Sequence, residues 1–388
     1  MKNSIQEVSA EICVGCGACA AVCPVRAVSI QEKEGFYYPS VDKSKCIDCG
    51  KCQKACAVFG ESTQRNDPVS WYAGYIEPSR MSKHSTSGGI CTELTKQYIQ
   101  KGHSVYASAF DNDWSLSHRE VKGLEDLEQF SGSKYLQSSI SAETYGEIAD
   151  KLKREEACLF IGTPCQVGAL VEYLHVNKIT PNRLLTVDFM CHGAPSPLLG
   201  KKFIQHLEKK AGKKITYYNF RSKAFGWGGL DRMLEFADGS KKVISAAICP
   251  LHSWFGRHLS IRKSCFNCQY RTKQRASDIT VADFWGIDKS YPEIPTKQGI
   301  SAIQINSEKG RKAYDFLREE CGLISYDVSE DSVWARKTAL TNFAKPQAYE
   351  AFWESANTLT IKELIKKFPP QSKMGCLKQF IKSIIRRH

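Results

Sequence analysis

The feature that most constrains this chain is a cysteine spacing that occurs twice near its N-terminus. The first occurrence reads CVGCGACAAVCP and the second reads CIDCGKCQKAC, with every cysteine repeated 33 positions later. Positions that match at a fixed offset indicate an internal repeat. The eight cysteines of the repeat are Cys13, Cys16, Cys19, Cys23, Cys46, Cys49, Cys52 and Cys56.

The spacing C-x2-C-x2-C-x3-C is typical of ferredoxins that hold two 4Fe–4S clusters, in which the fourth cysteine of each run binds the other cluster. We therefore assign one cluster to Cys13, Cys16, Cys19 and Cys56, and the other to Cys23, Cys46, Cys49 and Cys52. Gly17 and Gly50 allow the backbone to turn close to a cluster. Pro24 fits the ferredoxin pattern, while Ala57 replaces the second proline. The alternative is zinc, which favours two CxxC pairs over two crossed runs.

The full set of 17 cysteines in 388 residues also limits where the chain works. There is no run of about 18 apolar residues and no signal-peptide pattern at the N-terminus. We expect a cytoplasmic protein, and in a reducing compartment so many cysteines indicate metal ligands or redox chemistry rather than disulfides.

The rest of the sequence alternates strand-like and helix-like segments, which predicts an α+β or α/β fold with a mixed sheet. No G-x-G-x-x-G follows a strand and no P-loop motif is present, so neither a Rossmann nicotinamide domain nor a P-loop nucleotidase is supported. The predicted organisation is a ferredoxin-like domain (1–60), a linker (61–70), a body of two regions (71–155 and 156–330) and a helical extension (331–388).

Five ordered stretches in the body carry a resemblance. They are STSGGI from Ser85, GTPCQVG from Gly162, DFMCHGAPS from Asp188, NFRSKAFGW from Asn219, and CFNC from Cys265 followed by SDITVADFWG. Together with the cysteine repeat, they resemble the family formed by the beta subunits of coenzyme F-420 hydrogenases and dehydrogenases, over residues 5–325. One departure is Ala282, where the family usually has glycine.

The resemblance implies a flavoprotein that binds FAD, with the flavin-binding region at 71–155, and a third, inner 4Fe–4S cluster in the region 156–330. It implies four ligands for that cluster: Cys165, Cys191, Cys265 and Cys268. By spacing alone only the CxxC pair is suggestive, although cysteines at strand ends of an α/β fold can converge on one point. The alternative is two buried free thiols beside a zinc-binding or unliganded pair.

The predicted flavin contacts come from two stretches. Ser87, Gly88 and Gly89 precede a helix whose N-terminal amides can bind a pyrophosphate; the alternative is an ordinary N-cap by Ser87. The second stretch is assigned by resemblance, with Lys134 offsetting negative charge and Tyr135 lying against a ring. Its predicted contacts are Lys134, Tyr135, Gln137 and Ser138.

His192 follows Cys191 directly and is the predicted catalytic proton donor, because reduction of a flavin or a substrate consumes protons. The alternative is a structural histidine. Arg221, Lys223 and Trp227 are interpreted either as a basic, aromatic rim for an anionic substrate or as a packed strand edge.

More than half of the net charge of +13 lies in residues 361–388, which hold eight Lys or Arg against one acid. Residues 377–387 have the pattern of a basic amphipathic helix, which could place the protein peripherally at the inner membrane surface or against a partner. The alternatives are a helix packed on its own body and a frayed end. Because the excess is confined to the tail, nucleic-acid binding is not expected.

The predicted function is that of an iron–sulfur, FAD-dependent oxidoreductase. Electrons from ferredoxin or another redox protein would pass through 4Fe–4S clusters to FAD and on to a small organic substrate. One alternative is an electron-transfer subunit of a larger redox complex without a substrate site of its own. The second is a structural iron–sulfur protein whose basic tail binds membrane or nucleic acid.

Overall fold

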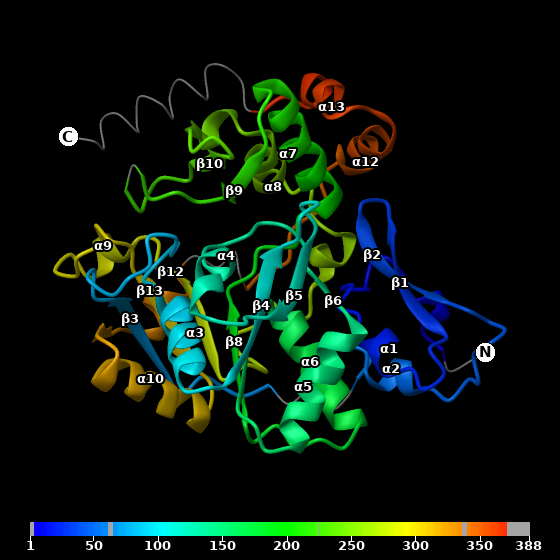
Figure 1. The fold of residues 1–388 in the computed structure, drawn as a ribbon, viewed down its shortest axis with the longest axis horizontal. Helices are drawn as coiled ribbons and strands as arrows, with labels where there is room; N and C mark the ends of the chain where they lie inside the picture. The colour runs from blue at the N-terminus through cyan, green and yellow to red at the C-terminus, as the bar shows by residue number, and fades with distance from the viewer. Residues whose placement is uncertain (1–3, 61–64, 225, 336–339, 371–388) are drawn as a thin grey trace.

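The protein folds around a nine-stranded mixed sheet (Figure 1), seen in a computed structural model that describes residues 4–60, 65–224, 226–335 and 340–370. The strand order is β14-β3-β13-β12-β8-β7-β4-β5-β6. The strands are β3 (Ser70–Ile76), β4 (Ser104–Phe110), β5 (Leu116–Glu120), β6 (Ser139–Ile140), β7 (Cys158–Ile161), β8 (Leu184–Phe189), β12 (Ile279–Asp283), β13 (Ser301–Ile305) and β14 (Leu323–Asp327).

Five of these strands run in the same direction. β12, β8, β7 and β4 pair in parallel, and β3 is antiparallel to β13, which is itself antiparallel to β12. The carboxyl ends of β3, β12, β8, β7 and β4 therefore lie at one edge of the sheet. In α/β folds such an edge is where ligands bind.

Helices cover both faces of the sheet, as buried strands require. The longer ones are α3 (Ile90–Gln100), α5 (Ala142–Lys153), α6 (Pro164–Val176) and α10 (Glu308–Glu320). Leu94 of α3 and Tyr314 of α10 pack with Val105, Leu159 and Val187 in one core cluster. The near-continuous apolar sequences of β7 and β8 follow from this burial on both faces.

A second layer stands over the carboxyl edge of the sheet (Figure 1). It contains α7 (Pro197–Ala211), the antiparallel sheet of β9 (Ile215–Asn219), β10 (Arg232–Phe236) and β11 (Lys241–Ile244), α8 (Pro250–Gly256), α12 (Tyr349–Thr358) and α13 (Ile361–Lys367). The turn between β10 and β11 contains Asp238 and Gly239, which has a φ of 79°. β10 and β11 pair as an antiparallel hairpin around this turn, for which an Asp-Gly pair is well suited.

The N-terminal segment contains the hairpin of β1 (Val28–Lys33) and β2 (Phe36–Val41) and two single-turn helices, α1 (Ala18–Ala21) and α2 (Lys51–Lys54). It packs against α5 and α6 (Figure 1). Gly17 and Gly50 precede α1 and α2 with φ of 83° and 74°. Both repeats thus place a glycine in the left-handed conformation just before the helix. A residue with a side chain would be strained in that conformation.

The shorter elements complete the described chain. They are the helices α4 (Leu127–Phe130), α9 (Ile287–Ser290) and α11 (Glu330–Val333), and the 3-10 turns η1 (Ile5–Glu7), η2 (Leu124–Asp126), η3 (Ala246–Ile248) and η4 (Lys263–Asn267).

The mixed α/β fold predicted from the sequence is confirmed. Helix α6 begins at Pro164, because Thr163 and Gln166 form a capping box and proline suits the first helical position. Cys165 therefore lies in the first turn of α6. The predicted domain limits stay a prediction, and strands from 71–155 and 156–330 share one sheet.

Two predictions concern membranes and the C-terminus. Among the residues that the structure describes, no helix is long and apolar enough to span a membrane. The basic amphipathic helix predicted at 377–387 lies outside the described residues.

Candidate functional site

The first quartet (Cys13, Cys16, Cys19 and Cys56) is brought together by the loop before α1 and the end of α2. Burial, together with the nearby thiols of Cys56 and Cys13, raises the pKa of the Cys16 thiol to about 12. Burial also raises the pKa of Cys19, again with Cys16, Cys13 and Cys56 as neighbours. The amide of Val58 donates to Cys56 Sγ at 3.5 Å. Such amide–sulfur bonds stabilise thiolate charge and tune a cluster's potential.

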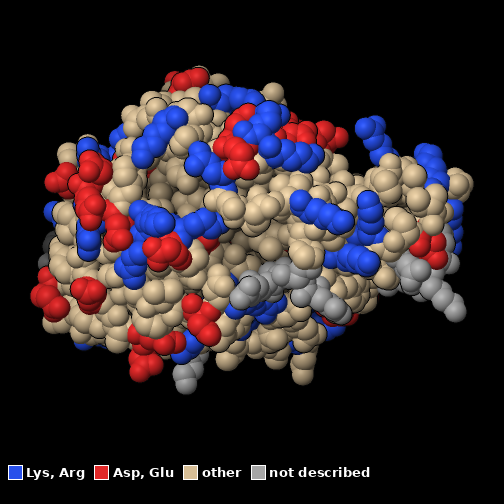
Figure 2. All heavy atoms as spheres, turned by 90° about the horizontal axis from the view of Figure 1, so that it is seen from below, with Lys and Arg blue, Asp and Glu red and all other residues tan. Residues whose placement is uncertain are grey.

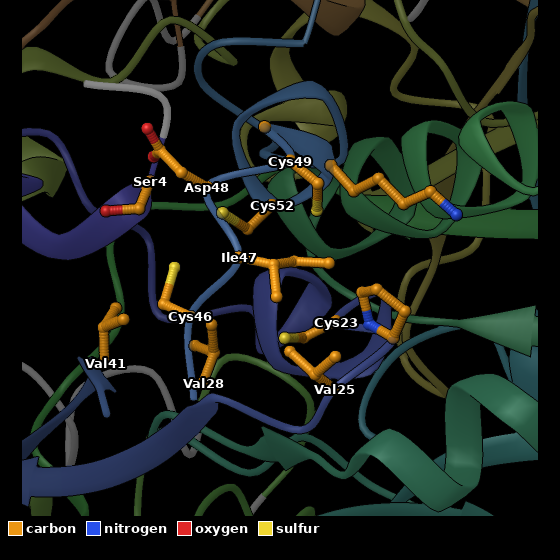
Figure 3. A pocket seen from close by; sticks show the side chains of 13 residues that line it. Ser4, Cys23, Val25, Val28, Val41, Cys46, Ile47, Asp48, Cys49 and Cys52 are labelled. Atoms are coloured by element: carbon orange, nitrogen blue, oxygen red, sulfur yellow. The ribbon is translucent and has the colours of Figure 1, made fainter. Parts of the chain in front are cut away.

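The second quartet (Cys23, Cys46, Cys49 and Cys52) lines one surface pocket (Figure 3). The amide of Ala27 donates to Cys23 Sγ at 3.2 Å. Ile47 and Val25 also line the pocket, and 60% and 37% of their surfaces are exposed. This quartet therefore lies at the surface of the protein.

The inner quartet (Cys165, Cys191, Cys265 and Cys268) assembles at the carboxyl edge of the sheet. Burial raises the pKa of Cys265 to about 12, with Cys191 and Cys268 as neighbouring thiols, and burial also raises that of Cys165. Cys191 follows β8, and the CxxC pair lies on and after η4. The amides of Gly193 and Ala194 donate to Cys191 Sγ and Cys265 Sγ at 3.4 and 3.3 Å.

The donor chemistry of all three quartets fits a 4Fe–4S cluster, because each offers four cysteine sulfurs and at least one amide aimed at a sulfur. Iron binds the thiolate form, so the burial that raises these pKa values makes cluster assembly a proton-releasing step. Within the described part of the chain, no group of three or more His, Cys, Asp or Glu is arranged to hold a single metal ion.

Two buried tyrosines link the first quartet to the inner quartet. The hydroxyl of Tyr145 donates to the carbonyl of Cys16 at 3.0 Å, and that of Tyr270 donates to the carbonyl of Ala57 at 2.7 Å. The pKa of each tyrosine is raised by burial first and then by thiols of both quartets. Gly168 makes room for Tyr270, since a Cβ there would lie 2.3 Å from its hydroxyl oxygen.

The three quartets therefore lie in sequence. Cys52 of the second quartet is a near neighbour of Cys19 in the first, and Tyr145 and Tyr270 connect the first to Cys165 in the inner one. The same apolar core contains Cys19, Cys52, Tyr145 and Tyr270, with Cys165 packed against it. The first quartet is the middle member of the series.

Arg262 is a functional candidate that sequence reasoning missed. It is 1% exposed, and its Nε donates to the carbonyl of Cys13 at 2.6 Å. One terminal nitrogen donates to Gln137 at 3.3 Å and the other has no hydrogen-bond partner in the described chain. None of its contacts there is an ion pair with a carboxylate.

A buried guanidinium without a carboxylate is costly unless another negative charge compensates it. The Arg262 charge acts on the thiol of Cys265, whose pKa it lowers against the larger opposing effect of burial. Cysteine thiolates bound to clusters in the first and inner quartets would supply the compensating charge. Arg262 lies three residues before Cys265, and nothing in that spacing distinguishes it from any other arginine.

The predicted phosphate loop at Ser87, Gly88 and Gly89 precedes α3 at the carboxyl edge. Gly89, with a φ of 84°, is the N-cap, while the Ser87 hydroxyl donates to the carbonyl of Ile300 at 2.8 Å, so the alternative of an N-cap by Ser87 is wrong. The Ser133 amide donates to Thr86 Oγ1 at 2.7 Å, which joins this loop to the second predicted stretch. Lys223 adds a cation, since its Nζ donates to the Ser87 carbonyl at 2.6 Å and burial lowers its pKa to about 8.

The remaining predicted flavin contacts point elsewhere. Lys134 Nζ donates to the carbonyls of Phe130 and Ser131 at 3.0 and 3.1 Å, and burial lowers its pKa to about 7. Tyr135 packs against aromatic rings of the second layer. Gln137 donates to the carbonyl of Val14, and Ser138 Oγ accepts from Gln166 at 3.0 Å. The α3 loop has the glycines and the nearby lysine that a phosphate site would use, while the Gly88 amide donates to Ser301 Oγ at 3.0 Å. Binding of FAD stays a prediction.

The other predicted residues divide between surface and interior. His192 is exposed in the loop after β8, beside Cys191. Arg221 forms an ion pair with Asp283, and Trp227 Nε1 donates to the same carboxylate at 2.9 Å. Arg221 and Trp227 are 4% and 8% exposed, so the packed alternative describes them better than an open rim.

Two parts of the chain match known protein families. Residues 12–59 match the 4Fe-4S dicluster domain, and residues 155–329 match the C terminus of the beta subunit of coenzyme F420 hydrogenase/dehydrogenase. These matches confirm the resemblance seen in the sequence, and they support iron–sulfur clusters and a redox role for the chain.

Two proteins are similar to this chain over most of its length. One subunit of the F(420)H(2) dehydrogenase from Methanosarcina mazei is 22% identical over 325 residues, which cover 80% of this chain and 83% of that protein. A chain of the F420-reducing [NiFe] hydrogenase complex from Methanosarcina barkeri is 14% identical with a TM-score of 0.47, covering 78% of this chain and 92% of that chain.

Proposed function

We propose that this chain is an iron–sulfur flavoprotein subunit that exchanges electrons between a ferredoxin-type carrier and a small organic substrate. The observation that supports it is the series of three cysteine quartets. It begins at the surface with Ile47 exposed and ends at Cys191 and Cys265, at the edge of the sheet where α/β folds bind ligands.

The chemistry comes from the bound groups, and the residues hold and tune them. The 4Fe–4S clusters supply one-electron transfer when bound, and FAD supplies the change between one and two electrons. The apolar core around Tyr145 and Tyr270 excludes water between the first and inner quartets. Ser87, Gly88, Gly89 and Lys223 would hold the flavin phosphates, with the Lys223 ammonium offsetting their charge.

His192 is the proposed proton donor. It is exposed and adjacent to Cys191, so it can exchange a proton with solvent beside the inner quartet. A His192→Asn variant should retain its iron and its reduction by the carrier, while substrate turnover falls and loses its dependence on pH near neutrality. A variant whose turnover and pH profile match the wild type would contradict this role.

The substrate is proposed by similarity. The relative from Methanosarcina mazei is named for F420H2, so a reduced deazaflavin is the first candidate to assay. That relative is named as a subunit, and this favours the alternative in which the chain transfers electrons within a larger assembly. Turnover by the purified single chain selects a substrate site on this chain, and turnover only with added subunits selects the larger assembly.

Anaerobic purification followed by iron and flavin quantitation tests the proposal directly. Three cubane clusters correspond to about twelve irons per chain, and one FAD is expected. Reduced ferredoxin should bleach the clusters and then the flavin. About eight irons, or clusters that do not bleach with dithionite, would contradict the arrangement proposed for this chain.

A further inference from the structure

A broad hollow lies between α2 of the ferredoxin-like segment and the C-terminal end of α6. Its volume is about 1090 Å³. We name it the basic cleft and define it by six of its lining residues: Lys51, Lys54, Phe59, His175, Lys178 and Ile179.

The charges of the basic cleft have one sign. Three lysines and a histidine line it, and no Asp or Glu does so among the described residues. Lys51, Lys54 and Lys178 are exposed, and none of them forms an ion pair with a carboxylate in the described chain. In Figure 2, basic side chains predominate on the part of the surface formed by the ferredoxin-like segment. The cleft therefore attracts an acidic surface.

The shape and lining of the cleft favour a protein over a small molecule. Phe59 is 46% exposed, and the lysines and the histidine of the cleft are exposed as well. A small ligand bound there would therefore keep much of its surface in contact with solvent. An exposed aromatic side chain surrounded by polar and charged ones is the usual centre of a protein–protein contact. A partner seated here would bury Phe59 and pair with the lysines.

The cleft is directly connected to the second quartet. Lys51 lines both the cleft and the pocket that contains Cys23, Cys46, Cys49 and Cys52. Cys52 lies between Lys51 and Gln53 on α2, and α2 packs against α6. A protein in the cleft therefore touches the helix that presents a ligand of the outermost cluster.

We propose that the basic cleft docks a small acidic electron-carrier protein, which exchanges one electron with the cluster held by the second quartet. The carrier loses the electron that this cluster gains, or the reverse, and no bond is made or broken. The inference rests on the proposed function for the electron transfer itself, but the docking surface stands on the cleft, its charges and Phe59.

The test is a charge reversal at exposed lysines of the cleft that are not themselves cluster ligands. The double variant Lys54→Glu/Lys178→Glu is compared with Lys242→Glu, which reverses an exposed lysine on β11 in the second layer. The probe is an oxidised, acidic two-cluster ferredoxin, and the readout is its dissociation constant by calorimetry at low and high salt. We expect the double variant to bind about tenfold more weakly at low salt, with the difference shrinking as salt screens the charges. Lys242→Glu should bind like the wild type.

A further variant, Phe59→Ala, tests the apolar part of the contact. It should bind the ferredoxin more weakly than the wild type at both low and high salt. Equal affinities for the double variant and the wild type would overturn the proposal. A loss seen only with Ile47→Glu would also overturn it, since the carrier would then dock over the pocket of the second quartet.

The two hypotheses fail separately. Clusters that do not bleach with dithionite refute the proposed function whatever the affinities are. Clusters that bleach normally, combined with unchanged binding by the double variant, refute only the basic cleft. Iron content measured on every variant confirms that the second quartet remains assembled.

Discussion

The ferredoxin-like segment and the carboxyl edge of the sheet each gather cysteines, but over very different lengths of chain. Eight cysteines of the first and second quartets lie between residues 13 and 56. The inner quartet takes one cysteine from the first turn of α6, one from the end of β8 and two from η4 and the residue after it. The first two quartets need only short loops and left-handed glycines, whereas the inner one needs the whole sheet.

This difference in sequence separation shows that the first two quartets depend on local loops, whereas the inner quartet depends on the central sheet. Short loops close at small entropic cost, so local quartets can form wherever their backbone turns are allowed. The inner quartet exists only if β7, β8 and the chain before β12 are aligned, because parallel pairing sets where their ends lie. Variants that remove one cysteine or one buried partner separate these two dependences.

The largest effect is expected from removing one cysteine of each kind. Cys268→Ala should lose only the inner cluster and keep about eight irons. Cys16→Ala should lose both N-terminal clusters and keep about four, because each loop of the repeat carries ligands for both. Iron analysis and EPR after anaerobic reduction measure this.

Cys91→Ala is the matched control, since Cys91 lies on α3 and belongs to no quartet. It should keep about twelve irons. If Cys268→Ala also loses the N-terminal clusters, the local and the sheet-dependent quartets do not assemble independently.

A second test uses Arg262, which joins the two kinds of site. Arg262→Met removes the donor to the Cys13 carbonyl and the positive charge near Cys265, and should lower the free energy of unfolding by about 2–3 kcal/mol. Loss of a nearby positive charge also makes reduction of the clusters harder, so their midpoint potentials should fall. EPR-monitored redox titration measures this.

Arg262→Lys restores the charge without the fork geometry, and should recover the potentials more fully than the stability. Potentials that are the same in Met and Lys variants would show that the guanidinium acts only by packing.

A third test uses acid. His118 is buried on β5, and its Nε2 is hydrogen-bonded to the carbonyl of Ile161, at the strand end that leads to Cys165. Burial lowers the pKa of His118 to about 4. Between pH 6.5 and 4 the unfolded chain therefore binds a proton that the folded chain does not, so stability falls by about 1.4 kcal/mol per pH unit as the pH drops.

His118→Gln should flatten this part of the pH dependence of thermal unfolding, measured anaerobically with clusters bound. Acid should also release the inner cluster before the N-terminal ones, because His118 supports β7 and not the ferredoxin-like loops. Simultaneous release of all clusters in the wild type would contradict this order.

The smallest effect is expected from Tyr270→Phe. It removes the hydrogen bond to the Ala57 carbonyl and should cost about 1 kcal/mol of unfolding free energy. Tyr173→Phe is the control, because no hydrogen bond of the Tyr173 hydroxyl is found in the described chain. Chemical denaturation of both variants measures the difference, and equal stabilities would show that Tyr270 contributes by packing alone.

Much of the fold could be predicted because the main elements have strong local signals. The strands at β3, β4, β7 and β8 are short apolar runs, and α10 has a clear helical period between serine and a polar end. Strands such as β5, with the sequence LSHRE, lack such a pattern and form because β4 offers a pairing edge. The β-propensity of a segment does not reveal whether a neighbouring strand is available for pairing.

The candidate site divides in the same way. Motifs located the cysteines and the α3 loop, but the adjacent positions of Lys134, Gln137 and Ser138 did not reveal that their side chains leave in different directions. Arg262 escaped notice because its partners at Cys13 and Gln137 are distant in the sequence.

The sequence by itself determined the chemistry of the first and second quartets, because the repeated spacing indicates which thiolates can share one cluster. Only the tertiary structure decided that the inner quartet comes together, the order of the quartets and their environment. That order depends on which strand ends meet at the sheet edge and on which buried side chains, such as Tyr145, Tyr270 and Arg262, are carried between them. Contacts of this kind join residues more than 100 positions apart, and no local pattern encodes them.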